Sequence, residues 1–224
     1  MRGSALALLA PLLAACAAVP AAPRLVSLGD VAPGVALDVR YAGADNFVGA
    51  PIDGYERPAC LLSERAARAL AAVQRDLEAE GLGLRVFDCY RPRRAVAHFV
   101  RWARDLGDQR TKAAYYPRVE KAGLFAEGYI AERSGHSRGS TIDLTLVARR
   151  KNGRVELGMG TPFDLFDPRS HTESPEVTVA QRANRLRLRA AMERRGFRNY
   201  PLEWWHYTLE DEPYPDREFD VPVR

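Results

Sequence analysis

The sequence contains few of the residues on which metal and redox chemistry depend. Among 224 residues there are only three cysteines and four histidines, so any such chemistry must draw on a very short inventory. An excess of one charge is also absent, because 33 basic residues stand against 29 acidic ones and the net charge is only +4. This surplus does not indicate a dense basic patch, and nucleic acid is not an expected partner. Hydrophobic residues at 46% and charged residues at 28% match ordinary globular usage, which excludes a disordered chain, a collagen-like repeat and a multi-pass membrane protein.

The amino terminus has the order of charged and apolar residues typical of a secretory signal peptide. Arg2 precedes an apolar run over 5–15, which is too short to cross about 30 Å of hydrocarbon as a helix. The run ends in Leu13-Ala14-Ala15-Cys16, which resembles the bacterial lipobox, where cleavage falls before the cysteine and its sulfur is acylated. We therefore predict a lipoprotein signal peptide over 1–15, lipidation of Cys16, export to the periplasm or cell envelope, and attachment to a membrane through the lipid. The alternative is an ordinary signal peptide cut within the Ala-rich stretch that follows.

The rest of the chain reads as a tether followed by one domain. Residues 16–24 are rich in Ala and Pro, and no second linker, low-complexity tract or internal repeat follows, so we predict a single domain over 25–224. If Cys16 carries a lipid, Cys60 and Cys89 are the remaining thiols, and an even pair in an exported protein is a disulfide candidate. Two separate buried thiols are the alternative, because the sequence does not set their distance.

Helical and strand patterns are mixed irregularly along this domain. Strands are indicated by alternation, as in Ile142, Leu144 and Leu146, and helices by apolar residues three and four apart. Because no regular strand–helix–strand order appears, we predict an α+β fold with a central antiparallel sheet and flanking helices. The predicted elements are a helix over 63–80 capped by Ser63, a strand over 84–87, a helix over 92–107, a strand over 141–147, a hairpin turn at Asn152-Gly153 leading into 155–157, a helix over 177–195 and a strand over 203–209.

The predicted helix over 177–195 has an apolar stripe and a basic face. The stripe, which we expect to face the core, consists of Val179, Ala183, Leu186 and Ala190. The arginines, which we expect to form the solvated face, are Arg185, Arg187, Arg189, Arg194 and Arg195. A membrane-surface role for these arginines is the less favoured alternative.

Four short segments concentrate residues that can take part in catalysis. A lone histidine is more often a hydrogen-bonded structural residue than a ligand, and a lone arginine is more often a surface charge, so no segment is decisive alone. The segments are Asp88-Cys89-Tyr90-Arg91-Pro92, Ser134 to Asp143 (SGHSRGSTID), Met159 to Asp164 (MGTPFD) and Glu203-Trp204-Trp205-His206.

The second and fourth segments together can build a metal site. Glycines on both sides of His136 indicate an irregular loop that can hold this imidazole against Asp143 on the strand that follows. His206 adds a second imidazole, and two histidines with one carboxylate leave a position on zinc for water. Glu203 can act as a general base near that water. Residues three apart point to opposite faces of a regular strand, so we expect Pro201 to place Glu203 on the loop entering the strand of His206.

Taken together, the motifs resemble the bacterial D-alanyl-D-alanine dipeptidases, the VanX-type zinc enzymes of the D,D-peptidase/hedgehog superfamily. The resemblance extends from about Leu25 to Tyr214. One departure is Thr141, where the family usually has Ala, and it adds a hydroxyl beside the site without removing a functional group. The segments that carry the resemblance are Tyr41-Ala42, Asp45-Asn46-Phe47, Gly49-Ala50, the YRP turn, the SxHxxGxxxD signature, the Asp-Leu-Thr-Leu strand, MGTPFD with Ser170-His171, and the EWWH end.

The resemblance implies a role for each site residue. It implies one zinc ion per chain, held at the sheet by His136, Asp143 and His206. Glu203 would be the catalytic base, and Arg91 would stabilise the developing oxyanion. The residues implied in substrate binding are Asp164 and Tyr55 at the ammonium group and Ser134 at the terminal carboxylate. The remaining histidines are His171, whose role stays open, and His98, which we expect to be structural on its helix.

The reaction implied by the resemblance is zinc-dependent hydrolysis of D-Ala-D-Ala to two D-alanines in cell-wall metabolism. This substrate is a small zwitterion, and a closed pocket that captures both charged ends would restrict cleavage to dipeptides. One alternative is a zinc D,D- or L,D-carboxypeptidase that trims peptidoglycan stem peptides through a more open cleft. Another is a non-catalytic envelope protein that keeps the zinc fold for binding. The presence of Glu203 and Arg91 argues against this non-catalytic alternative, because binding alone needs neither a base nor an oxyanion partner. The sequence specifies no oligomeric state.

Overall fold

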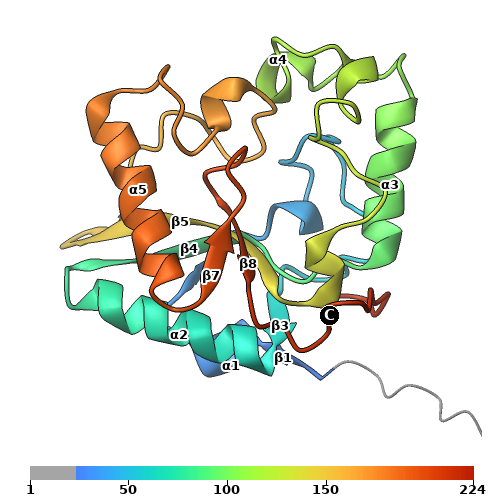
Figure 1. Ribbon diagram of the computed structural model, residues 1–224. Helices are drawn as coiled ribbons and strands as arrows, with labels where there is room; N and C mark the ends of the chain where they lie inside the picture. The colour runs from blue at the N-terminus through green and yellow to red at the C-terminus, as the bar shows by residue number, and fades with distance from the viewer. Residues whose placement is uncertain (1–23) are drawn as a thin grey trace, which may run out of the picture.

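The computed structural model describes residues 24–224, so the predicted signal peptide, Cys16 and nearly all of the tether lie outside the described residues. Helices surround a central sheet (Figure 1). The strands are β1 (Leu25–Ser27), β2 (Ala36–Leu37), β3 (Leu61–Ser63), β4 (Leu82–Asp88), β5 (Thr141–Arg150), β6 (Gly153–Glu156), β7 (Phe197–Asn199) and β8 (His206–Leu209). The α-helices are α1 (Leu28–Val31), α2 (Glu64–Glu78), α3 (Arg93–Arg104), α4 (Lys112–Tyr115) and α5 (Val179–Glu193).

The main sheet has the strand order β2-β4-β5-β8-β7, with β6 also paired to β5. All of its pairs are antiparallel except β2 with β4. The prediction of an α+β fold with a central antiparallel sheet and flanking helices is therefore confirmed, apart from this one parallel edge. The two residues of β2 offered too short a pattern to be recognised in the sequence. A separate two-stranded sheet pairs β1 with β3.

Strand β5 is the centre of the fold. It pairs with β4, β6 and β8, and every residue from Thr141 to Ala148 is buried. The alternation of Ile142, Leu144 and Leu146 correctly predicted a strand, but the intervening residues are buried as well, because both faces of the sheet are covered. The hairpin that follows turns on residues 151 and 152, one residue earlier than predicted, and Gly153 already pairs with Arg150.

The predicted helices α2 and α3 are present. Ser63 caps α2 by accepting a hydrogen bond from the backbone N–H of Ala66, as the sequence indicated. Leu70 and Val73 are fully buried, on the helix face that contacts β4. Helix α3 begins directly after Pro92 and ends at Arg104, three residues before the predicted end.

The predicted apolar face of α5 is wrong, whereas Arg187, Arg194 and Arg195 of the predicted basic face are exposed as expected. Val179, expected in the core, is 87% exposed, whereas Arg185, expected in solvent, is fully buried. The helix packs through four residues that the apolar stripe missed: Arg185, Leu188, Ala191 and Met192. The stripe was chosen by hydrophobicity alone, and an arginine can join a core when its N–H groups find acceptors.

A disulfide joins Cys60, before β3, to Cys89, at the end of β4, with their Cα atoms 5.3 Å apart. The disulfide links the two-stranded sheet to the end of β4, where the segment Asp88 to Pro92 with Arg91 begins. In the described part of the chain, no helix is both long and apolar enough to cross a bilayer.

Candidate active site

The three predicted metal ligands come from three neighbouring elements. Asp143 on β5 and His206 on β8 are directly paired across the sheet, so their side chains leave adjacent backbone positions. His136 lies in the 3-10 turn Gly135–Arg138, which Ser134 caps by accepting a hydrogen bond from the His136 backbone N–H. Gly139 ends this turn with a φ of 80°, a conformation that favours glycine, and the chain then enters β5.

The side chains of these residues converge on one point. His136 Nε2 lies 3.3 Å from Asp143 Oδ2, and His206 Nδ1 lies 3.1 Å from Asp143 Oδ1. The two imidazole nitrogens are 3.4 Å apart, and all three donor atoms fall within 4.8 Å of one another. Asp143 Oδ1 is buried without a hydrogen bond of good geometry. Two imidazoles and a carboxylate with an unsatisfied buried oxygen fit a divalent metal ion of the zinc type.

The orientation of His136 is fixed by the backbone. Its Nδ1 lies 2.6 Å from the carbonyl oxygen of Cys89, which can only accept, so Nδ1 carries the hydrogen and Nε2 is left free toward Asp143. Burial lowers the pKa of His136, which favours the neutral imidazole that metal binding requires. The Cys60–Cys89 disulfide thus restrains the residue that holds a metal ligand.

Arg91 reaches the same point from the turn before α3. Its guanidinium donates to Asp88 Oδ2 from Nε at 3.0 Å, and Nη2 lies 3.4 Å from Asp143 Oδ2. Its Cζ lies 5.1 Å from the ring centres of both Tyr41 and Phe99, so two aromatic faces and two carboxylates restrain the cation.

Glu203 occupies the turn immediately before β8, as the sequence predicted from Pro201. Its Oε2 lies 3.4 Å from His206 Nδ1, and its carboxyl group lines the same cavity as Arg91. Burial raises the pKa of Glu203 to about 7, against the opposing effect of His206. A carboxylate with this pKa can both accept and release a proton near neutral pH.

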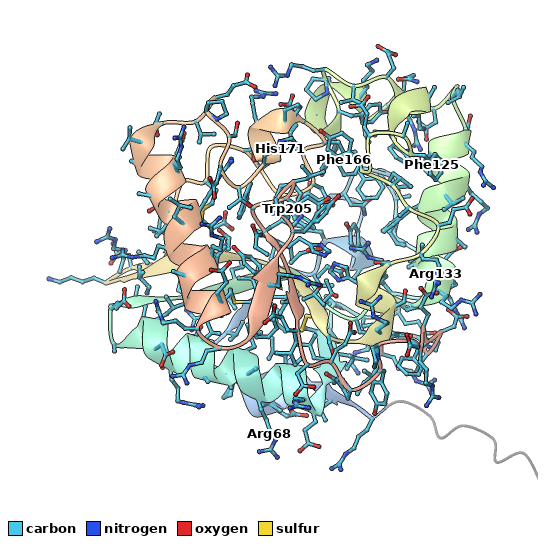
Figure 2. The ribbon with its side chains drawn as sticks, in the orientation of Figure 1. Arg68, Phe125, Arg133, Phe166, His171 and Trp205 are labelled. Carbon is cyan, nitrogen blue, oxygen red and sulfur yellow. A yellow bond between two sulfur atoms is a disulfide. The ribbon has the colours of Figure 1, made fainter. Side chains whose placement is uncertain are left out.

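Four of these residues, Arg91, Asp143, Glu203 and His206, line one cavity of about 320 Å³, and His136 is fully buried beside it. This volume lies at the lower end of the range for small-molecule sites. Figure 2 shows two of its aromatic residues, Phe166 and Trp205, near the centre of the molecule between α5 and α3. The sequence did not predict that aromatic residues would line the cavity. They include Tyr41, Phe47, Phe99, Tyr129, Phe166 and Trp205.

Of the three predicted substrate-binding residues, two line this cavity. Asp164 Oδ2 accepts a hydrogen bond of 2.9 Å from the hydroxyl of Tyr41, and burial raises the pKa of Asp164 well above its ordinary value. The hydroxyl oxygen of Ser134 accepts from the His136 backbone N–H, so its hydrogen remains available to a ligand.

The third residue expected to contact the substrate, Tyr55, has a buried carboxylate as its hydrogen-bond partner. Tyr55 is 7% exposed, does not line the cavity, and donates its hydroxyl hydrogen to Asp88 Oδ1 at 2.6 Å. It therefore holds the carboxylate that holds Arg91. The tyrosine that hydrogen-bonds to Asp164 is Tyr41. Its segment contributed to the family resemblance, but the sequence analysis gave Tyr41 no role.

Comparison with known proteins places this chain in a family. The family model described as D-ala-D-ala dipeptidase matches residues 21–224. The chain belongs to the D-Ala-D-Ala dipeptidase family. Proteins named D-alanyl-D-alanine dipeptidase from Enterococcus faecalis and Streptomyces coelicolor are 46% and 44% identical to it over 196 and 194 residues. These matches cover 88% and 87% of this chain and 96% and 95% of the relatives. A third, from Enterococcus faecium, is 43% identical over 197 residues, which cover 88% of this chain and 96% of that relative.

The other histidines of this family member lie outside the cavity. His98 on α3 accepts a hydrogen bond from the Asp53 backbone N–H, which gives it the structural role expected of it. His171 lines a separate hollow with Pro201 and Leu202, and the cavity lining does not include it. Thr141, the departure from the family pattern, pairs its hydroxyl with Thr208 across the β5–β8 ladder at 2.9 Å and does not line the cavity either.

Proposed function

We propose that this protein is a zinc D-alanyl-D-alanine dipeptidase that acts in cell-wall metabolism. The observation that carries the proposal is that one cavity of about 320 Å³ is lined by Asp143 and His206 of the metal-ligand cluster together with Glu203, Arg91 and Asp164, while His136 completes the cluster from beneath its wall. This set contains a metal site, a base for the attacking water, a cation for the oxyanion and a buried carboxylate for the ammonium group of a zwitterionic dipeptide. The names of the relatives support the same substrate.

The catalytic roles follow from position and chemistry. A zinc ion held by His136, Asp143 and His206 would polarise the scissile carbonyl and acidify a water molecule when bound. Glu203, next to His206, takes the proton of the attacking water and later delivers it to the leaving amine. Arg91 donates hydrogen bonds to the oxygen that becomes negative in the tetrahedral intermediate. Its anchoring by Asp88 keeps it oriented before the substrate arrives.

The substrate roles use the two remaining polar groups. Asp164 accepts the ammonium group of the dipeptide through a charge-assisted hydrogen bond. Ser134 donates its hydroxyl hydrogen to the terminal carboxylate. The segment 128–135 lies along the cavity together with Tyr200, and a substrate bound at both ends leaves little room for a longer peptide.

The small cavity favours a dipeptidase over a D,D- or L,D-carboxypeptidase, which must admit a stem peptide. A non-catalytic binding protein is disfavoured by Glu203 and Arg91, for which binding alone has no use. Hydrolysis of dipeptides of L and D stereochemistry, and of tri- and pentapeptides ending in D-Ala-D-Ala, distinguishes these functions. We expect release of D-Ala from D-Ala-D-Ala alone, whereas efficient cleavage of the longer peptides would identify a carboxypeptidase.

The test of catalysis is Glu203→Gln, which removes the base and keeps the shape of the side chain. We expect hydrolysis of D-Ala-D-Ala to fall by about 100- to 10,000-fold, with one zinc per chain still bound. The measurements are the rate of D-Ala release and the metal content. Unchanged hydrolysis in this variant would refute the assignment of Glu203.

We also propose that the protein is exported and anchored by a lipid on Cys16. The sequence Leu13-Ala14-Ala15-Cys16 supports this, and a disulfide between the other two cysteines suits an oxidising compartment. Cys16→Ala is expected to move the protein from the membrane fraction to the soluble fraction and to abolish acylation measured by mass spectrometry. An unmodified Cys16 in the mature wild-type protein would rule out the anchor.

A further inference from the structure

Arg185 is the most unusual charged residue of the fold. It lies on α5, is fully buried, and makes no ion pair with any carboxylate in residues 24–224. Burial and the nearby Arg182 lower its pKa to about 10, so it is still cationic at neutral pH. A buried cation without a counter-ion costs several kcal/mol unless its donors are satisfied. The acceptors of its N–H groups therefore decide whether this burial is stable.

The guanidinium binds both ends of one loop. Nε donates to the carbonyl oxygen of Met159 at 2.6 Å, near the start of the loop. Nη1 donates to the carbonyl oxygens of Arg169 and His171, at 2.8 and 2.6 Å, at its end. One side chain thus closes the segment 159–171, which carries Asp164 into the cavity.

A hydroxyl extends this network to the turn that carries Glu203. Thr161 Oγ1 lies 3.4 Å from Arg185 Nη2 and accepts a hydrogen bond of 2.8 Å from Trp204 Nε1. The Ser170 hydroxyl oxygen lies 3.2 Å from Thr161 Oγ1 and so belongs to the same network. The backbone N–H of Trp204 in turn donates to the carbonyl oxygen of Ser170. The substrate loop and the Glu203 turn are therefore tied together behind the cavity.

Asp164 needs such support because its backbone is strained. Its φ is 61°, and it is the one residue other than glycine with a positive φ in the described part of the chain. A conformation of this kind costs about 1–3 kcal/mol in a residue other than glycine and persists only where the surroundings hold it. The Ser170 hydroxyl, which belongs to the Thr161 network, donates to the carbonyl oxygen of Leu165 at 2.7 Å, one residue from Asp164.

We propose that Arg185 is a positioning residue of the dipeptidase site: it sets the conformation of the loop 159–171 and thereby places Asp164 for the substrate ammonium group. The inference rests on the proposed function, because it assigns that role to Asp164. Arginine is required because its planar fork donates in several directions at once, whereas the single ammonium of lysine cannot reach carbonyls at both ends of the loop.

The main test compares Arg185→Met with Arg187→Met, a matched control two residues along α5 whose side chain is 55% exposed. A misplaced binding group can cost about 100-fold. We expect Arg185→Met to raise the KM for D-Ala-D-Ala by about 10- to 100-fold, with a smaller change in kcat and one zinc still bound. Arg187→Met is expected to match the wild type.

Two further measurements separate positioning from general loss of stability. Hydrogen exchange is expected to accelerate in 160–171 and at Trp204 in Arg185→Met, with α2 and β4 unchanged. Arg185→Met and Asp164→Asn are expected to be non-additive, because both act through the same carboxylate. If Arg185→Met does not fold, Arg185→Lys and Thr161→Val are measured in the same way, with smaller effects expected.

The proposal is overturned if loop exchange and KM in Arg185→Met stay within about twofold of Arg187→Met. Exchange that accelerates uniformly, or losses that add to those of Asp164→Asn, would also overturn it. Hydrogen exchange requires no substrate, so it tests the effect of Arg185 on the loop independently of the proposed enzymatic function. A wild-type enzyme that does not hydrolyse D-Ala-D-Ala would refute the proposed function alone.

Discussion

The two halves of the cavity are built by different means. Asp143 and His206 project from paired strands, and His136 is held by a carbonyl at the end of β4, so backbone pairing places the metal ligands. Asp164, which lines the same cavity, projects from an irregular loop that is held by side chains such as Arg185 and Tyr41. In the proposed function the chemistry of hydrolysis is assigned to the sheet and the choice of substrate to a loop, and changes to the two halves should then have different kinetic signatures.

Removal of a sheet ligand should have the largest effect. His136→Ala and His206→Ala are each expected to abolish measurable hydrolysis, because a catalytic zinc site needs all three protein ligands. His171→Ala is the matched control, since this histidine lies outside the cavity. Elemental analysis checks the metal content of all three variants, and a full zinc complement in the double variant His136→Ala/His206→Ala would contradict the ligand set.

Arg91 tests whether the sheet half acts on the transition state. Arg91→Met is expected to lower kcat by about 100- to 1000-fold with little change in KM, because the oxyanion forms only during reaction. Steady-state kinetics checks this, and Arg91→Lys, which keeps the charge, should recover part of the loss. A change confined to KM would assign Arg91 to substrate binding instead. Thermal melting is measured alongside, since Asp88 is left buried without its arginine and keeps only the hydrogen bond from Tyr55.

Asp164 tests whether the loop half selects the substrate. Asp164→Asn is expected to raise KM for D-Ala-D-Ala by about 10- to 100-fold, the cost of losing one charge-assisted hydrogen bond. N-acetyl-D-Ala-D-Ala, which lacks the ammonium group, should be a poor substrate of the wild type and gain relative to D-Ala-D-Ala in the variant. Equal losses on both substrates would show that Asp164 does not read the ammonium group.

Asp167 tests how the loop half responds to pH, and we expect the smallest effect here. Its buried carboxylate accepts hydrogen bonds from Arg169 and Arg118, which hold its pKa well below the ordinary value although burial acts to raise it. Because the pKa of Asp167 is lower in the folded than in the unfolded state, where it is about 4, its ionised form stabilises the fold at pH values above about 4. This stabilisation is lost as the pH falls below the unfolded-state pKa toward the folded-state pKa.

Asp167→Asn should therefore reduce the free energy of unfolding by about 2 kcal/mol at neutral pH, with a smaller difference from wild type at about pH 3. Urea denaturation at both pH values checks this. Asp38→Asn is the matched control, because Asp38 is a carboxylate in contact with an arginine at the surface, and it should change stability little. A difference that is the same at both pH values would exclude the proposed linkage.

Local signals predicted the parts of the fold that depend on local physics. The Ser63 cap and the start of α3 after Pro92 were both found where the sequence placed them. The buried face of α5 was not, because its central residue is an arginine. Its burial depends on carbonyl oxygens from residues 159, 169 and 171, a partnership that no helical periodicity encodes.

The site shows the same division. The sequence selected His136, Asp143, His206, Glu203 and Arg91 as one group because their motifs are specific in type and spacing, and the structure brings these residues together. Tyr55 was expected at the substrate and Tyr41 was given no role. Both are buried tyrosines near a carboxylate, and only their hydrogen-bond partners, Asp88 and Asp164, distinguish them. The aromatic wall of the cavity carried no motif.

The scarcity of histidine and cysteine limited the candidates for metal and disulfide chemistry, and by itself the sequence determined which residues could take part. The tertiary structure decided which of them meet: His136, Asp143 and His206 at one point, Cys60 with Cys89, and His171 and Tyr55 away from the cavity. The physical reason is that residue type fixes the chemistry a side chain can perform, whereas strand register and loop closure fix the ångström-scale distances on which that chemistry depends.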